Sequence, residues 1–467
     1  SYTSYRRQQA EGWQLNPYEE NSKTHELEET GKVASTGFYA NTVNQKFTFD
    51  ATDKLSFYAR GGYYDNKTRR PYEAYDYNIL HETFNYGIGA QYMINKGNYI
   101  TADCYADHFS SSYCFFKDNK TYNGKAGEEQ VRKRTRNHNL SIKGIFKLGN
   151  RHKLSVGTEY IVDVLKSQTD NIAKEDAYTL ALFAQDEIKL LRNLQALIGV
   201  RYIYHENFKN HATPNVALMY KPGKFNFRAS YAAGFRTPTL SELYATDIAK
   251  KNDRLTIGNL DLKSEKNNYF SLSAEYVHER FSVSVNAFYN NIRDMIDYNT
   301  IATGDKAMEQ YGHKEVRQRD NIAEAKVHGI NVSANAYLGA GFNLSGGYTH
   351  LNTQDVELEQ PIDKSIKNAY NINAQWAHSW KIYRLNINLN GRFNSKRFSK
   401  SYGYAPEYQL WDLNTRHSFN LKSVIIEPGC GMENLFDYMD DRPYNSNYAT
   451  LTPGRSFYIS LSLKFKS

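Results

Sequence analysis

The sequence predicts an all-β protein, a transmembrane antiparallel β-barrel with about twenty strands. Three observations lead to this fold class: many segments alternate apolar and polar residues, these segments are long, and short turns alternate with long polar loops. A tilted strand that crosses a bilayer needs about nine to eleven residues, whereas strands of soluble sheets usually have about five or six. The alternating segments extend over roughly ten residues or more, so their length favours a membrane barrel over a soluble β-sandwich.

The alternation separates two faces, because successive side chains of a strand point to opposite sides. Leu154, Val156 and Tyr160 fall on one face, and Ser155 and Glu159 fall on the other. The same interleaving recurs in three further segments: 329–336, 384–390 and 457–465. Such a period of two is typical of strands and not of helices.

Short and long connections alternate along the whole chain, and their order predicts the topology. Turn residues such as Gly149-Asn150 and Pro222-Gly223 mark the short connections. We expect short turns near 50–54, 94–98, 147–152, 189–194, 221–224, 277–281, 337–342, 378–381 and 421–424. We expect long loops near 9–34, 64–82, 109–131, 165–176, 206–213, 236–263, 294–321, 353–366, 396–408 and 438–452. Nine turns and ten loops join twenty strands, and the last strand ends on the side of the short turns.

The composition agrees with a membrane barrel. The mean hydropathy is −0.71, which suits a barrel because only alternate residues of each strand face lipid. No segment approaches the roughly twenty apolar residues of a membrane helix. The 39 tyrosines suit membrane interfaces and ligand-contacting loops. The net charge of +8 comes from scattered basic residues apart from the run Arg132 to Arg136, so we expect no nucleic acid as a partner.

No linker or composition break divides the chain, so residues 1–467 are expected to form one barrel domain. The sequence has no phosphate-cradling glycine motif, nucleophile elbow or paired metal ligands, and we therefore expect no enzyme, cofactor or metal site. Cys104 and Cys114 fall at the end of one predicted strand and in the loop after it. An oxidising compartment would permit a disulfide between them, with Cys430 left over.

Four segments carry sequence motifs in a fixed order. They are YAAGFRTPTLSELY at 231–244, GNLDLKSEK at 258–266, NNIRDMIDY at 290–298, and ENLFD at 433–437 together with PGRSFY at 453–458. In this order and spacing they resemble the TonB-dependent receptors of Gram-negative outer membranes. Pro238, Glu242 and Gly454 are expected to shape turns and loops instead of touching a substrate.

The resemblance implies a 22-stranded barrel that is plugged by an N-terminal domain. The present chain would supply strands 3–22, and the plug, the TonB-binding segment and the first two strands would be absent from it. The partners that the resemblance implies are an upstream N-terminal fragment carrying those parts, TonB acting through the plug, the lipid bilayer with its lipopolysaccharide, and an accessory surface lipoprotein. The long loops would be extracellular, and the C-terminus would be periplasmic.

The resemblance also implies active import of a scarce nutrient, such as a ferric siderophore, cobalamin or haem. Haem receptors of this family often have a histidine between the first two motif segments, and residues 237–257 contain none. This disfavours haem and leaves ferric siderophore and cobalamin open. A haem receptor and a passive outer-membrane porin are the alternatives, although a porin would not need the four receptor-like segments.

The long loops offer the candidate ligand contacts. These candidates are Tyr244, Arg254, Tyr311, His313, Tyr402 and Tyr404. Aromatic rings give contact area at a low cost in conformational entropy, and arginine suits anionic chelates. His211 and His313 could ligate iron, although an exposed loop histidine is usually only solvated.

Overall fold

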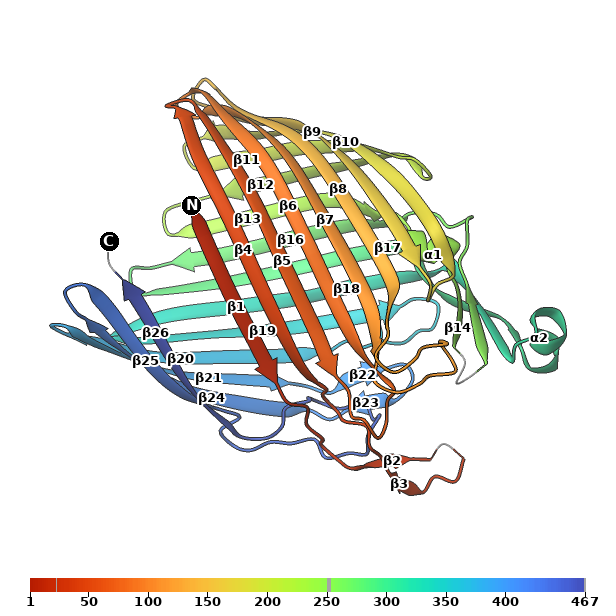
Figure 1. Ribbon diagram of the computed structural model, residues 1–467. Helices are drawn as coiled ribbons and strands as arrows, with labels where there is room; N and C mark the ends of the chain where they lie inside the picture. Colours follow the sequence, from red (N-terminus) through yellow and green to blue (C-terminus); the bar gives the residue numbers. More distant parts are fainter. Residues whose placement is uncertain (22, 250–252, 466–467) are drawn as a thin grey trace.

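The computed structural model describes residues 1–21, 23–249 and 253–465. The chain forms one large sheet whose long strands run antiparallel to their neighbours and curve into a barrel wall (Figure 1). The described residues contain no helix that is long and apolar enough to cross a membrane. The predicted fold class is confirmed.

In the described part of the chain the sheet has 22 members. Two of them, β14 (Thr246–Ala249) and β15 (Arg254–Ile257), belong to a loop, which leaves twenty strands in the wall. The wall strands are β1 (Tyr2–Ala10), β4 (Gly37–Thr52), β5 (Leu55–Arg69), β6 (Tyr77–Asn95), β7 (Asn98–Phe115), β8 (Glu129–Leu148), β9 (His152–Ser167), β10 (Ile172–Leu191), β11 (Leu194–His205), β12 (Lys209–Tyr220), β13 (Phe225–Arg236), β16 (Glu265–Val277), β17 (Phe281–Thr303), β18 (Glu315–Gly339), β19 (Phe342–Asp355), β20 (Asn368–Trp380), β21 (Tyr383–Asn394), β24 (Tyr408–Asn420), β25 (Val424–Glu433) and β26 (Ser456–Phe465).

The small elements all lie in the long connections. They are the hairpin β2 (Tyr18–Glu20) and β3 (Leu27–Glu29), helix α1 (Leu240–Tyr244), helix α2 (Gly304–Tyr311), and the hairpin β22 (Arg397–Ser399) and β23 (Gly403–Ala405). Helix α2 stands at the far end of β17 and β18, the longest strands, away from the rest of the wall (Figure 1).

All nine predicted turns join consecutive wall strands. The loops at 168–171 and 206–208 are shorter than predicted because the strands that flank them continue through polar residues. In a sequence, a segment with polar side chains at every position is typical of a loop. A strand that extends beyond the membrane can have the same composition, because both of its faces meet water.

The wall has two edge strands. Strand β1 pairs with β4, and β26 pairs with β25. Within the described residues no register joins β1 to β26. Each edge therefore offers backbone groups to which a further strand can pair.

The outward face is apolar and carries two rows of aromatic rings. On the loop side, neighbouring rings of the row lie 4.6–6.0 Å apart and belong to Tyr160, Tyr178, Tyr204, Tyr231, Phe270, Tyr348, Tyr370 and Phe393. On the turn side they lie 4.9–6.1 Å apart and belong to Phe225, Phe227, Tyr276, Phe281, Phe342, Trp376, Trp380, Tyr383 and Phe419. Two such rows around an apolar band are typical of outer-membrane barrels.

The disulfide expected between Cys104 and Cys114 is wrong, since both cysteines are free. Both lie in β7, ten residues apart, which corresponds to about 33 Å at the rise of a strand. A disulfide requires Cα atoms within about 7 Å. The polar segment Ser110–Ser112 suggested a loop, but it continues the strand.

Candidate functional site at the loop end of the barrel

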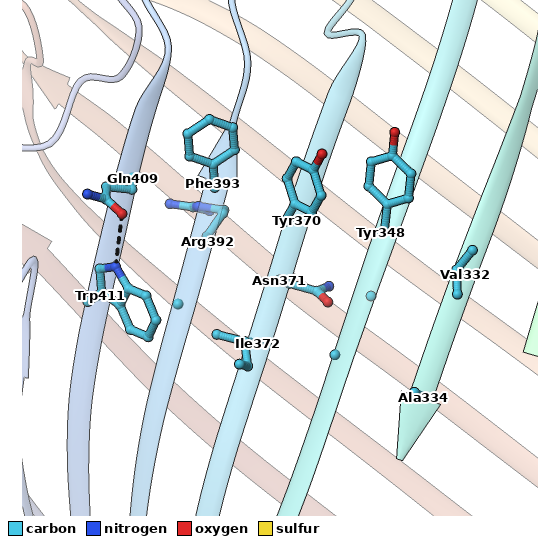
Figure 2. A pocket seen from close by; sticks show the side chains of 13 residues that line it. Val332, Ala334, Tyr348, Tyr370, Asn371, Ile372, Arg392, Phe393, Gln409 and Trp411 are labelled. Carbon is cyan, nitrogen blue, oxygen red and sulfur yellow. Dashed lines mark hydrogen bonds between the residues drawn. The ribbon is translucent and has the colours of Figure 1, made fainter. Parts of the chain in front are cut away.

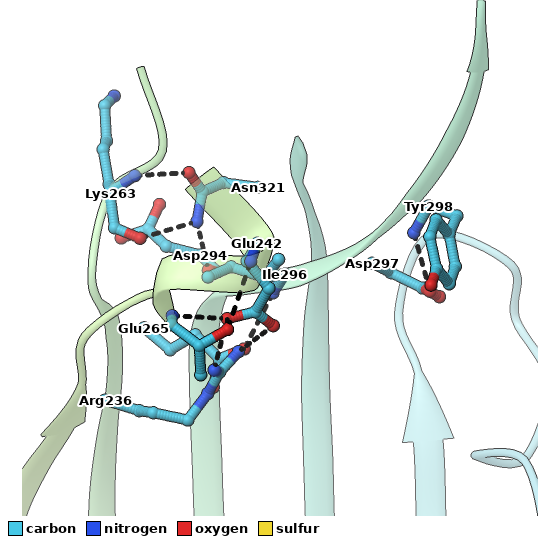
Figure 3. Close-up of polar contacts among 10 residues, drawn as sticks. Arg236, Glu242, Lys263, Glu265, Asp294, Ile296, Asp297, Tyr298 and Asn321 are labelled. Atoms are coloured by element: carbon cyan, nitrogen blue, oxygen red, sulfur yellow. Dashed lines mark hydrogen bonds and ion pairs between the residues drawn. The ribbon is translucent and has the colours of Figure 1, made fainter. Parts of the chain in front are cut away.

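The first two motif segments meet at one guanidinium group, that of Arg236 at the end of β13 (Figure 3). Its Nε and Nη2 donate to the Glu265 carboxylate at 2.8 and 2.6 Å. Its Nη1 and Nη2 donate to the Glu242 carboxylate at 2.9 and 3.2 Å. Two bidentate pairs on one arginine fix both direction and distance. The end of β13, the start of β16 and helix α1 are thereby tied together. The third motif segment joins the first two through the Ile296 backbone N–H, which donates to Glu265 Oε1 at 2.8 Å.

Helix α1 begins with a capping box that uses the same glutamate. The Glu242 backbone N–H donates to Thr239 Oγ1 at 3.2 Å, and the Thr239 backbone N–H donates to Glu242 Oε2 at 2.8 Å. Burial would raise the pKa of the Glu242 carboxyl, but the hydrogen bonds from Arg236 and Thr239 outweigh burial and lower it. Glu242 therefore stays ionised and holds Arg236 and the helix start at once.

Asn321 of β18 joins the second and third segments (Figure 3). Its side-chain amide donates to the carbonyl oxygens of Lys263 at 3.0 Å and Asp294 at 2.6 Å. In return Asn321 Oδ1 accepts from the Lys263 backbone N–H at 2.7 Å. Asn321 escaped the sequence analysis because it lies far from both segments along the chain. In the structure, Asn321 pairs with Ile296, at the polar end of the third segment.

A small apolar core supports these polar contacts. Leu243, Leu262 and Ile296, one from each of the three segments, are buried against one another, and Phe208 and Tyr244 pack on them. The three segments thus form one unit, which we call the α1 module and define as residues 236–249 and 253–265 with 294–296 and Asn321. Its contacts support the expectation that these segments shape the loops.

The fourth segment folds on itself in the same way. Asn434 Nδ2 donates to the Tyr438 carbonyl at 2.7 Å, and Asp437 Oδ1 accepts from the Arg455 backbone N–H at 2.7 Å. Gly454 has φ +96°, and a Cβ there would lie 3.0 Å from Asp437 Oδ1. Glycine is the residue that tolerates this conformation at this distance.

The structure brings three of the six candidate ligand residues together. Arg254 begins β15, which pairs in parallel with β18 through Glu315. Tyr311 at the end of α2 packs on the same buried cluster as the residues that follow Arg254. His313 Nδ1 lies 2.9 Å from Asp253 Oδ1, and this contact lowers the pKa of the Asp253 carboxyl.

The other three candidates lie apart from that group. Tyr244 packs on the apolar core of the α1 module. Tyr402 and Tyr404 occupy the tip of the β22–β23 hairpin, where 61% and 58% of their surfaces are exposed. His211, the other histidine considered for iron, stacks on Phe235 at 4.3 Å and contacts a loop serine. Of these residues, Tyr402 and Tyr404 are the most available to a ligand.

The inward face of the wall is mostly polar. In the first half it carries ion pairs and cation–π contacts, such as Arg201 with Glu159 and Arg60 over the Tyr105 ring at 4.9 Å. In β20, β21 and β24 it carries a group of amides: Asn373, Asn386, Asn388, Asn390 and Asn414. A polar lumen suits the passage of polar cargo or the docking of a polar plug.

A depression of about 430 Å³ over β18–β24 is lined by Tyr348, Tyr370 and Trp411 (Figure 2). It exists because glycines lie between the rings; at one of them, Gly391, a Cβ would lie 2.6 Å from the Trp411 ring. These side chains share the face of Val332 and the loop-side aromatic row, which is the outward face. The depression therefore belongs to the lipid-facing surface and not to a path for cargo.

The profile of a family described as TonB dependent receptor-like, beta-barrel matches residues 2–434. The chain belongs to this family. TonB-dependent receptor barrels lie in the outer membrane, and the family is one of receptors and not of enzymes. The resemblance seen in the four motif segments is thereby confirmed.

The chain is similar to the ferric enterobactin receptor of Pseudomonas aeruginosa, with 23% identity over 371 residues that cover 68% of this chain and 49% of the relative. This chain spans about half the length of that relative.

Among solved structures, the same receptor from P. aeruginosa matches with a TM-score of 0.80 and 16% identity, over 99% of this chain and 76% of the other. A siderophore receptor of Acinetobacter baumannii matches with a TM-score of 0.76 and 15% identity, over 99% and 75%. The FrpB iron transporter of Neisseria meningitidis matches with a TM-score of 0.71 and 14% identity, over 99% of this chain and 76% of the other. At these identities the likeness shows the fold.

Proposed function

We propose that this chain is the wall and outer-loop part of a TonB-dependent receptor that imports a ferric siderophore. The observation that carries the proposal is a polar lumen inside a wall whose outward face is apolar and ringed twice by aromatics. Such a wall separates a hydrophilic path from lipid. The sequence relative that is named a ferric enterobactin receptor supports an iron chelate over cobalamin or haem as the cargo.

We also propose that an upstream piece of the receptor completes the barrel. The unpaired edges of β1 and β26 support this idea, because each can accept one more strand. Two further strands would raise the twenty of the wall to the 22 that the family's barrel implies. The same piece would carry the plug and the segment that contacts TonB.

The proposed orientation places the long loops outside the cell and the nine short turns, with the C-terminus, in the periplasm. The ligand would then meet the loop end of the barrel first. Tyr402 and Tyr404 are the proposed first contacts because their rings are exposed there. Arg254, Tyr311 and His313 form the second proposed contact region.

Uptake by living cells tests this function. The full-length receptor is expressed in iron-starved cells that lack their own siderophore receptors, with TonB present or deleted. We expect radioactive iron to accumulate from a ferric catecholate siderophore and to require TonB. Labelled cobalamin and haem serve as the other cargoes. Uptake of cobalamin or haem without uptake of the ferric siderophore would contradict the proposed ligand. Uptake without TonB would indicate a passive porin.

A further inference from the structure

The basic run Arg132–Arg136, which the proposed function does not use, is divided between the two faces of β8. Arg134, Arg136, His138 and Leu140 are exposed, whereas the residues between them are partly buried. Leu140 faces outward with the apolar band, since it lies opposite Cys104 and Tyr160 on the neighbouring strands. The period of two therefore places Arg134 and Arg136 on the outside of the wall, above the apolar band.

The two other basic residues of the run have partners within the protein. The Arg132 guanidinium lies 4.9 Å from the centre of the Tyr122 ring and donates to Gln168 Oε1 at 2.9 Å. Lys133 Nζ lies 3.6 Å from Asp170 Oδ2. These two cations are accounted for by loop packing.

The outward cations are not compensated in this way. Arg134 lies directly opposite Lys166 of β9, which is also exposed. Like charges directly opposite each other destabilise a sheet. Within the described residues, no ion pair joins Arg134, Arg136 or Lys166 to a carboxylate. An anion from outside the chain would relieve this repulsion.

A depression of about 250 Å³ on the same face offers room for such an anion. Arg134 and Arg136 line it together with Ser110 and His108. The Nε2 atom of His108 is buried and has no hydrogen-bond partner among the described residues. The depression also holds Glu82, whose carboxylate accepts a hydrogen bond from the Tyr63 hydroxyl at 2.7 Å. The hydrogen-bond donors that line the depression therefore outnumber its one carboxylate.

Aromatic rings lie at the lower edge of the depression and directly below it, and Phe84 and His108 belong to its lining. Phe84 and Tyr86 are 5.7 Å apart, Tyr86 and His108 are 5.8 Å apart, and His108 and His138 are 5.4 Å apart. Going up β8 from Leu140, the outward residues change from apolar to aromatic to cationic. A membrane lipid changes in the same order, from acyl chain through the interface to its charged headgroup.

We propose that Arg134, Arg136 and Lys166, with His108 and Ser110, bind a phosphate group of a phosphorylated lipid of the outer leaflet. Guanidinium groups bind phosphate oxygens through paired hydrogen bonds, and lipid acyl chains would lie against the apolar band below. The proposal rests on the membrane orientation given under the proposed function.

Lipid binding to the full-length receptor in neutral detergent tests this site by native mass spectrometry. The probes are lipid A with its phosphates and the same lipid after dephosphorylation. The wild-type receptor should bind the phosphorylated form at least tenfold more tightly, because each cation near a membrane surface strengthens the binding of an anionic lipid about fivefold. The triple variant Arg134→Gln, Arg136→Gln and Lys166→Gln should lose that preference.

The matched control is the triple variant Lys221→Gln, Lys224→Gln and Lys422→Gln, which removes three exposed cations at the turn end. It should keep the preference. Equal binding of both lipids by the wild type, unchanged binding by the site variant, or displacement of lipid A by a phosphate-free acidic peptide would each overturn the proposal. These binding outcomes do not depend on iron uptake. The lipid site and the import function are therefore tested by separate experiments.

Discussion

The α1 module and the β22–β23 hairpin lie at the same end of the barrel but are built in opposite ways. In the α1 module, Arg236 is held by two carboxylates and three leucine or isoleucine side chains are buried beneath it. In the hairpin, Tyr402 and Tyr404 point into solvent at a tip that Gly403, with φ +69°, turns. The segments that form the α1 module hold loops in place, whereas the exposed rings of the hairpin lie where no motif is found.

The largest effect should follow from truncating the apolar core of the α1 module. Leu243→Ala should lower the free energy of opening of this module by about 3 kcal/mol, because it removes a nearly fully buried leucine. Hydrogen exchange of the 240–246 amides in the full receptor measures this opening. Leu260→Ala in the same loop is the control, since Leu260 is 67% exposed and should change the opening by less than about 0.5 kcal/mol. Equal effects from both would refute the buried core.

Removing the central guanidinium should come next. Arg236→Leu leaves Glu242 and Glu265 without their partner and should cost about 2 kcal/mol in module opening, a value reduced because Arg236 is partly exposed. The same exchange experiment measures it. Arg228→Leu, on the same strand and 3.6 Å from the Glu275 carboxylate, should cost less than about 1 kcal/mol. A smaller loss of opening free energy for Arg236→Leu than for Arg228→Leu would show that Arg236 does not hold the α1 module together.

The hairpin should respond in function and not in stability. Tyr402→Ala with Tyr404→Ala should leave the stability of the barrel within about 0.5 kcal/mol, because both rings are exposed. Siderophore affinity should fall about tenfold if the rings contact the ligand. Fluorescence titration with the ferric siderophore measures the affinity, and Tyr72→Ala, an exposed tyrosine of another loop, is the control. Unchanged affinity would remove these two tyrosines from the proposed site.

The smallest effect should be a pH dependence of the α1 module. The pKa of Glu242 lies below its ordinary value of 4.5, so its stabilising contribution is fully present above that value and is lost as the pH falls through the lowered pKa. Exchange protection of α1 should therefore decline from about pH 5 downward. Glu242→Gln should weaken this dependence of the α1 amides. Protection that rises on acidification would contradict this sign.

Much of the wall could be predicted from the sequence, because the period of two and turn residues such as Pro222-Gly223 are local signals. Strand ends outside the membrane could not, since both faces are polar there; this is why Cys114 was assigned to a loop. Strands β14 and β15 were also missed, because β14 pairs with β15 and the pairing of β15 with β18 depends on a distant segment. The motif segments could be identified in the sequence. The role of Asn321 became visible only in the structure, where three segments come together.

Strands β17 and β18 also set the reach of the protein beyond the bilayer. With 23 residues, β17 extends roughly 75 Å along its axis, about three times the height of the apolar band even before tilt is considered. Helix α2 is carried at the tip of this stiff pair. In the proposed orientation this tip lies outside the cell, where a large particle that approaches the cell could touch α2. The exposed Met308 is therefore a natural place for a fluorescent label, where it would report events at the cell surface without entering the lumen.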